Sequence, residues 1–213
     1  MKISVLVVFV FSLLAAAGYS QEKTVTIKKT IGYGKEVYQV KDKKSNIRQG
    51  SYSYKYGNNV QIKGQYDNDS KQGNWQYAIG DSFVINAFYN KGKKDSLWTY
   101  TNGDRLISEV KYKNDKREGT AIGYYNKRDK IQSIIPYQSN KIDGIKKTFY
   151  ENGNIKLEVK YVKDTIDGDV KYYNIDGKVI LHIIYKNGSP FSLEIMNLPD
   201  SIRYISGNLK DGT

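Results

Sequence analysis

The sequence contains no cysteine and one histidine, His182. Without cysteine the chain can form neither a disulfide bond nor a thiolate metal site. A single histidine also leaves no Cys-His pair, no His-rich metal site and no convincing Ser-His-Asp set. Because His182 lies among isoleucines in a predicted strand, we expect a structural role for it. These absences argue against an enzyme, so no catalytic residue, metal or cofactor is predicted.

Phosphate-binding loops are lacking as well. The 19 glycines are spread over turn positions, and Ile31–Gly34 holds a G-x-G fragment with no predicted helix after it. Glu109 and Glu158 occupy equivalent strand positions in different units. About four strands separate them, which places them ~20 Å apart. That distance is too long for paired acid–base catalysis, and we expect these carboxylates to pair with lysines on neighbouring strands.

Long hydrophobic runs are absent except at the N-terminus. Within Met1–Ser20, Lys2 precedes the apolar run Ile3–Leu14, and small residues follow. The run is shorter than the ~20 residues of a membrane-spanning helix, and the order is typical of a secretory signal peptide. Cleavage is predicted before Gln21 or after Ala17. We therefore expect export to the periplasm, the outer-membrane surface or the extracellular space, and secretion without disulfides fits a bacterial envelope protein.

Tyrosine, in contrast, is abundant, with 20 residues. Its context is clearest in Gly144–Gly168. There Lys146–Tyr150 is β-prone, and Asn152-Gly153 between two hydrophobic runs predicts a type I′ hairpin turn. Ile155–Tyr161 alternates apolar and charged residues, which predicts a second strand with one apolar face. Val162–Asp167 is predicted to be a polar connecting loop.

This unit recurs six times, with a period of 23–25 residues. The second-strand tyrosines are Tyr66, Tyr89, Tyr112, Tyr137, Tyr161 and Tyr185. The residues that open the units are Gly50, Gly73, Ser96, Gly119, Gly144 and Gly168. A near-fixed period predicts one repeat domain in which each unit packs on its neighbours. The predicted fold is all-β, an elongated, twisted antiparallel sheet of repeated β-hairpins with a cap at each end.

The predicted organisation has four parts. Residues 1–20 are the signal peptide, residues 21–49 an N-terminal cap that is partly flexible, and residues 50–188 the hairpin array. Residues 189–213 form a C-terminal cap, and the last residues resemble the approach to another unit, which leaves open whether the chain continues. The strand Val179–Tyr185 is apolar on both faces. Such strands are usually covered on both faces, so Ser189–Asp200 is predicted to fold back over it.

The repeat resembles a known family. Tyr100–Gly103 with Glu109 and Tyr112, and Tyr150–Gly153 with Glu158 and Tyr161, match the pattern Y-x-N-G followed by Glu and Tyr. Residues 50–188 are in this respect similar to the MORN-repeat variant of bacterial secreted proteins, some of which are labelled toxin–antitoxin antitoxins. The fourth unit departs from the pattern, because Asn126–Lys130 replaces the Asn-Gly turn. The resemblance implies an elongated β-sheet and an interaction role, and it supplies no catalytic residues.

Charge and aromatic residues give two candidate surfaces. The net charge is +12, and basic residues concentrate between the units. The candidate surface for an anionic partner consists of Lys91, Lys93, Lys94, Lys113, Lys116, Arg117, Lys127 and Arg128. The candidate aromatic surface, for a sugar or a protein, consists of Trp75, Tyr77, Trp98 and Tyr100. Alternatively, the lysines serve solubility and prevent edge-to-edge aggregation, and the aromatic residues are the packed face of the sheet.

These observations predict a non-catalytic secreted repeat protein that acts as a protein-interaction or scaffold module, with an unknown protein as partner. One alternative is binding of an anionic membrane surface or an acidic glycan through the lysine-rich loops. Another, implied by the family resemblance, is an antitoxin-like partner of a toxin protein. Nucleic acid is disfavoured, because arginine is the preferred residue for bases and phosphates and the chain has far more lysine than arginine.

Overall fold

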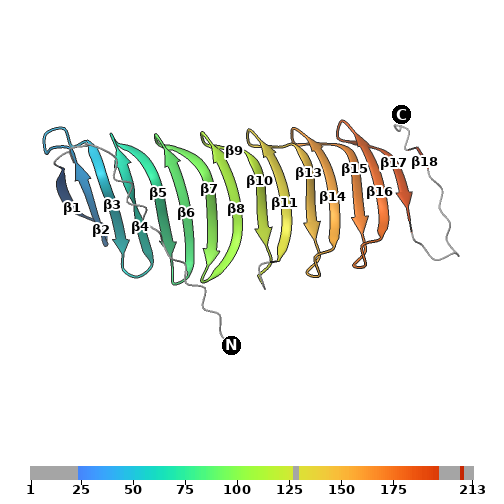
Figure 1. The fold of residues 1–213 in the computed structure, drawn as a ribbon, viewed down its shortest axis with the longest axis horizontal. Helices are drawn as coiled ribbons and strands as arrows, with labels where there is room; N and C mark the ends of the chain where they lie inside the picture. Colours follow the sequence, from blue (N-terminus) through green and yellow to red (C-terminus); the bar gives the residue numbers. More distant parts are fainter. Residues whose placement is uncertain (1–23, 127–129, 197–206, 209–213) are drawn as a thin grey trace, which may run out of the picture.

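The computed structural model describes residues 24–126, 130–196 and 207–208 (Figure 1). These residues form one open antiparallel sheet in which the hairpins lie side by side in chain order, so the predicted all-β hairpin array is confirmed. The part of the chain that the structure describes offers no apolar helix of membrane-spanning length.

The strands are β1 Val25–Ile31, β2 Gly34–Val40, β3 Arg48–Tyr56, β4 Val60–Asp67, β5 Ser70–Ile79, β6 Phe83–Asn90, β7 Lys93–Asn102, β8 Arg105–Lys113, β9 Lys116–Arg117, β10 Gly119–Tyr124, β11 Ile131–Gln138, β12 Lys141–Ile142, β13 Gly144–Phe149, β14 Ile155–Val162, β15 Thr165–Tyr173, β16 Val179–Lys186, β17 Ser189–Ile195 and β18 Gly207–Asn208.

The connections between units are tight turns rather than the polar loops predicted from the sequence. After β14, only Lys163 and Asp164 link Val162 to Thr165, and both have positive φ (49° and 73°), as a type I′ turn requires. Equivalent two-residue turns link every successive pair of units: Asn68-Asp69, Lys91-Gly92, Asn114-Asp115, Ser139-Asn140 and Asn187-Gly188. These six turns form one edge of the sheet, hereafter the inter-unit edge, which is the upper edge in Figure 1.

Asn102-Gly103 and Asn152-Gly153 lie on the other edge, and the type I′ prediction for these hairpin turns is wrong. At Asn152-Gly153 only the glycine has positive φ (93°). The Gly153 N–H donates to the Tyr150 carbonyl (2.9 Å), and the Tyr150 N–H donates to the Asn154 carbonyl (2.8 Å). This is the pattern of a three-residue loop, a type I turn followed by a left-handed glycine. At Asn102-Gly103, too, only the glycine has positive φ.

The residues predicted to open the units lie inside the first strands or at a break within them. All six have positive φ, from 57° at Ser96 to 117° at Gly144. At several of them the pairing register shifts, for instance between Lys63 and Gln65, where β4 faces Gly73 and its neighbours on β5. A bulge at this point in each repeat adds residues to one strand and bends the sheet.

Side chains alternate between two faces of the sheet, and the registers show that each face is continuous along the molecule. We call the face that carries Trp75 the aromatic face. One cross-strand row on it runs Glu36, Tyr54, Ile62, Tyr77, Ile85, Tyr100, Ser108, Gly123, Ser133, Thr148, Leu157, Tyr172, Leu181 and Ile195. The aromatic face is therefore rich in rings in its N-terminal half and aliphatic towards β17.

The core lies on the aromatic face around two tryptophans. Trp75 is 2% exposed and Trp98 is 5% exposed, and both pack against Ala87 and Tyr89. A tryptophan needs a small residue on the neighbouring strand. Gly64 provides this space, because a Cβ there would lie 2.2 Å from the Trp75 indole. The indole N–H of Trp75 donates to the Gln65 carbonyl (3.1 Å), so the ring is fixed at both ends.

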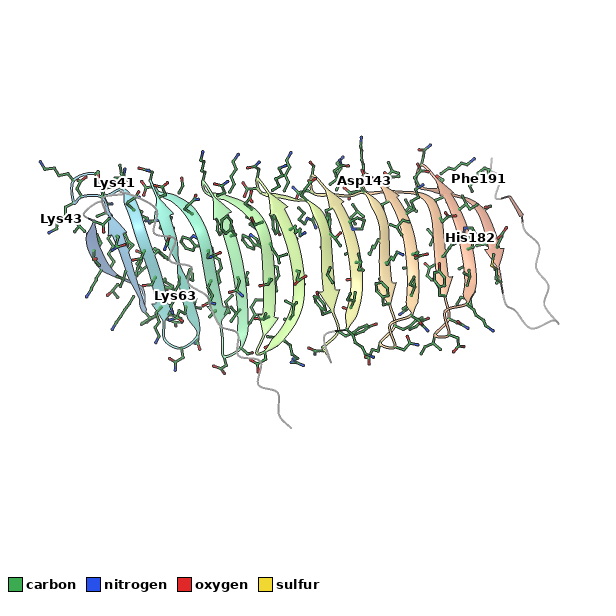
Figure 2. The ribbon with its side chains drawn as sticks, viewed as in Figure 1. Lys41, Lys43, Lys63, Asp143, His182 and Phe191 are labelled. Carbon is green, nitrogen blue, oxygen red and sulfur yellow. The ribbon has the colours of Figure 1, made fainter. Side chains whose placement is uncertain are left out.

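At both ends the array continues as strands. The stretch predicted to be partly flexible contains the β1–β2 hairpin, in which Tyr38 and Val40 are buried. At the other end, Ser189–Ile195 does not cover β16 as predicted, since β17 pairs beside β16 in the plane of the sheet. Residues 197–200 lie outside the described residues. On β16, His182 points to the face opposite the tryptophans and lies 2.7 Å from the Asp169 carboxylate (Figure 2).

Candidate functional site

A row of four cations crosses the aromatic face near the inter-unit edge. We define the cation row as Arg48, Lys71, Lys94 and Arg117. These residues are 23 positions apart, so each occupies the same place in its unit. Lys71 pairs with Tyr66, Lys94 with Tyr89, and Arg117 with Tyr112 across neighbouring strands. The repeat thus places a cation beside each second-strand tyrosine in this half of the sheet.

Each cation lies over aromatic rings. The Lys71 Nζ is 4.5 Å from the ring centroid of Trp75 and 4.9 Å from that of Tyr89. The Lys94 Nζ is 4.7 Å from the Trp98 ring. The guanidinium carbons of the two arginines lie at 5.0 Å (Arg48 to Tyr66) and 4.1 Å (Arg117 to Tyr137). The negative face of a ring attracts a cation at such distances, by about 0.5–1 kcal/mol where water has access.

The row ends after Arg117, where the repeat changes. The equivalent positions opposite the next three tyrosines are Ile142, Ile166 and Pro190. The tryptophans end over the same stretch, because Ala121, Lys146 and Val170 occupy the positions equivalent to Trp75 and Trp98. The cation row with its tryptophans therefore belongs to the N-terminal half of this face, and apolar residues take the row's positions in the C-terminal half.

The environment of Lys71 perturbs several groups. Burial lowers the pKa of Lys71, and the charge of Lys94 lowers it further. The Lys71 ammonium donates to the Tyr77 hydroxyl (2.7 Å), which lies 3.1 Å from the Tyr89 hydroxyl. Burial, followed by the hydrogen bond with Tyr89, raises the pKa of Tyr77. An anion beside Lys71 would relieve part of the repulsion between the cations.

Within the described residues, no carboxylate forms an ion pair with a member of the cation row. The ion pairs found there join Lys147 to Glu158, and His182 to Asp169 and Glu194. All three lie on the face opposite the cation row. Among the described strands, the charged residues of the aromatic face include Lys29, Arg48, Lys71, Lys94, Arg117, Lys146 and the buried carboxylate Glu36.

Acidic turn residues fix the backbone of the row instead of pairing with its charges. The Asp115 carboxylate accepts the Lys94 N–H (2.7 Å), and the Asp115 N–H donates to the Lys94 carbonyl (2.9 Å). Asp69 makes the same pair of bonds with Arg48. We call this two-bond arrangement the turn latch. At the equivalent place beside Lys71, Gly92 supplies the N–H bond (2.9 Å) but has no side chain for the second.

The predicted basic surface is partly brought together. Lys91, Lys93, Lys113 and Lys116 are exposed and flank two consecutive turns of the inter-unit edge, along which Lys41 and Asp143 also lie (Figure 2). Lys94 and Arg117 belong to the cation row. Lys127 and Arg128 lie outside the described residues. The predicted surface did not include Arg48 or Lys71, although their spacing in steps of 23 residues from Lys94 and Arg117 was a signal that could have placed them in it.

The predicted aromatic residues Trp75, Tyr77, Trp98 and Tyr100 do lie together on the aromatic face. Their rings are packed rather than free, however. Trp75 stacks on Tyr77 with 6.1 Å between the ring centroids, and both indoles are buried beneath the cation row. Tyr77 and Tyr100 are half-buried. A partner approaching this half of the face would therefore meet the cations before it met the tryptophans.

The opposite face carries a hollow of about 700 Å³ over β4 to β7. Its polar lining is mostly amides, and Lys63 is its one charged residue. The amides already bond to one another, since Gln76 donates to Asn86 (3.1 Å) and Asn86 donates to Thr99 (3.3 Å). This hollow lacks the concentration of like charge that distinguishes the cation row.

Comparison with protein-family models gives no match for this chain, and no curated protein matches it. The similarity to MORN-type repeats therefore rests on the sequence pattern described above.

Proposed function

We propose that this chain is a non-catalytic, exported binding scaffold that holds an acidic polysaccharide along the cation row. The observation that carries the proposal is the row itself, four cations in line on one face without carboxylate partners among the described residues. The pattern of Met1–Ser20 supports export. An elongated sheet suits an elongated ligand, because equivalent positions repeat along it.

The spacing of the row favours a polysaccharide over other polyanions. Two strands separate successive cations, so they lie about 10 Å apart. A sugar chain with one carboxylate per disaccharide carries its charges at a comparable interval. Phosphates of a nucleic acid strand follow each other every ~3.4 Å, which leaves most of them between the cations. A flat membrane surface is a poorer match, because these cations lie against aromatic rings of the sheet and do not project towards a plane of lipid headgroups.

The expected affinity is modest and depends on salt. A solvent-accessible ion pair contributes about 0.2–1 kcal/mol, so four together supply about 1–4 kcal/mol. A free energy of about −4 kcal/mol corresponds to a dissociation constant near 1 mM for a fragment that spans four units. A longer chain binds more tightly, because it can engage the row in many registers. Exposed charges about 10 Å apart are screened at physiological ionic strength, so binding should weaken as salt is added.

Hyaluronan, which carries one carboxylate per disaccharide, neutral dextran and anionic vesicles can be compared as ligands of the purified chain at low and high salt. We expect binding of hyaluronan at low salt, its loss at high salt, and no binding of dextran. The double variant Lys71→Gln/Lys94→Gln should weaken binding by about tenfold, which corresponds to about 1.4 kcal/mol. The control variant Lys55→Gln/Lys178→Gln removes the same number of charges near the edge opposite the inter-unit edge, and it should have little effect on binding. Equal losses in the two variants, or preferential binding of vesicles, would contradict the proposal.

A protein-interaction scaffold is the second candidate, and the aliphatic half of the aromatic face favours it. Tyr172 is 39% exposed and Ile195 is 43% exposed in a row that also contains Leu157 and Leu181. Exposed apolar surface of this kind is typical of protein-binding sites. Chemical cross-linking to proteins, compared between the unmodified chain and a Tyr172→Lys variant, would test this second candidate. A protein that binds this surface should no longer be cross-linked to the variant, whereas polysaccharide binding should persist.

A further inference from the structure

The aromatic face has a gap between its aromatic and aliphatic halves. In the cross-strand row that contains Tyr77, Ile85 and Tyr100, the next four positions are occupied by small residues, listed in order as Ser108, Gly123, Ser133 and Thr148. At Gly123 the packing leaves little room for a side chain, because a Cβ there would lie 2.7 Å from the Ser133 hydroxyl oxygen. Small side chains on successive strands lower the surface at this place.

A hollow of about 320 Å³ occupies part of this gap. Lys146 and Lys156 line it together with the hydroxyls of Ser133 and Thr148 and the amide of Gln132. No carboxylate lines it, and neither lysine forms an ion pair with a described residue. Its polar lining therefore combines two positive charges with neutral hydrogen-bonding groups, and it lies on the same face as the cation row.

The wall of the hollow is built by hydrogen bonds between units. The Tyr125 hydroxyl donates to the Phe149 carbonyl of the next unit (2.6 Å), and both residues line the hollow. The Lys156 ammonium lies 5.7 Å from the Tyr150 ring centroid. Fixed walls limit the reorganisation that a ligand would require on binding.

We propose that this hollow binds a single acidic sugar residue, a hexuronate. The carboxylate would lie between the Lys146 and Lys156 ammonium groups. The sugar hydroxyls would bond to Ser133, Thr148 and Gln132, and Ile135 and Phe149 would face the C–H surface of the ring. The volume is at the lower end of the range for ligand pockets, which suits one ring and exceeds the need of a bare oxyanion. The inference rests on the proposed function, as the hollow would hold one residue of the same polymer.

Glucuronate, glucose and inorganic phosphate are the probes, and binding to the full chain can be followed by chemical-shift changes of its backbone amides. We expect glucuronate to shift amides of β11, β13 and β14, and glucose to shift none. Lys146→Met should weaken glucuronate binding at least about tenfold, as expected for loss of a charged hydrogen bond. Lys160→Met is the matched control, because Lys160 is exposed on the opposite face of the neighbouring strand and its loss should leave binding unchanged.

The outcomes separate the hollow from the cation row. Glucuronate binding that survives Lys71→Gln/Lys94→Gln and is lost in Lys146→Met would support the hollow as a site of its own, whether or not the polymer binds. Hyaluronan binding with no glucuronate binding would overturn the hollow and leave the proposed function standing. Phosphate binding as tight as glucuronate binding would overturn the assignment to a sugar. A loss in Lys146→Met counts only if its circular dichroism matches that of the unmodified chain.

Discussion

The contact between Gly64 and Trp75 allows a quantitative test of how the repeat packs. A Cβ at Gly64 would lie 2.2 Å from the indole, and Trp75 is 2% exposed and held by its bond to the Gln65 carbonyl. In Gly64→Ala the indole must therefore move. Forcing a methyl group into a packed core costs about 1–3 kcal/mol, and replacing a strand glycine by alanine returns about 0.5–1 kcal/mol. We expect a net destabilisation of about 0.5–2 kcal/mol.

The same substitution should change sign when the indole is removed. Trp75→Ala alone should cost about 3–5 kcal/mol as a large-to-small change in the core. In that background the Gly64 methyl enters empty space, so Gly64→Ala should stabilise by about 0.5–1 kcal/mol. The coupling energy of the double-mutant cycle is then about 1–3 kcal/mol. The other units should keep their structure, because the stability of a repeat array is nearly a sum over units and their interfaces.

Urea unfolding of the four proteins of this cycle, followed by circular dichroism, gives the required free energies. Lys63→Ala is the control, since Lys63 is exposed on the same strand and points to the opposite face, and it should show no coupling to Trp75→Ala. If Gly64→Ala has the same effect with and without the indole, the packing explanation is refuted.

Three further predictions concern the turns and the titratable groups. Gly92→Asn should stabilise the chain by about 0.5–1 kcal/mol, because it completes the turn latch, whereas Gly92→Ala should destabilise it by about 1–2 kcal/mol at a φ of 78°. Burial opposes ionisation of Glu158, but hydrogen bonds from Lys147 and Tyr173 outweigh it and lower the pKa of Glu158 from 4.5. The ionised form then stabilises the fold at neutral pH and ceases to do so as the pH falls below 4.5, so Glu158→Gln should be destabilising at pH 7 and nearly neutral in acid. Burial first, and then interactions with neighbouring groups, raise the pKa of Tyr100 and Tyr173 from 10.0 to about 12, so the unfolded chain ionises first and stability should fall as the pH rises from 10 to 12.

Each of these has a direct measurement. Urea midpoints of the two Gly92 variants should move in opposite directions, and a gain in both would show that the added acceptor is not the cause. The difference in unfolding free energy between Glu158→Gln and the unmodified chain should shrink with acidification, and a constant difference would contradict the linkage. Tyrosinate absorbance should rise over two pH ranges, and the part that appears near pH 12 should shrink in Tyr100→Phe/Tyr173→Phe.

The two turn types show why local sequence misled at the edges of the sheet. Asn-Gly is the preferred pair for a type I′ turn, yet Asn152-Gly153 forms a three-residue loop with one left-handed residue. Lys163-Asp164 carries little of that preference and adopts type I′ angles. The reason is tertiary, because the Asp164 carboxylate accepts the Ile142 N–H (2.6 Å) of the preceding unit. Bonds between units compensate the cost of positive φ at Lys163.

The sequence alone was sufficient for the sheet. A period of two within each strand and a period of 23–25 residues along the chain require strands with one apolar face, and such strands are stable only beside copies of themselves. The spacing of residues also fixed which positions are equivalent. It did not show that Lys71 lies over the Trp75 ring, that Gly64 makes room for that ring, or that small residues open a hollow beside Lys146. Those features depend on contacts between strands of different units, where bulges set the register and bring together side chains that are far apart in the chain.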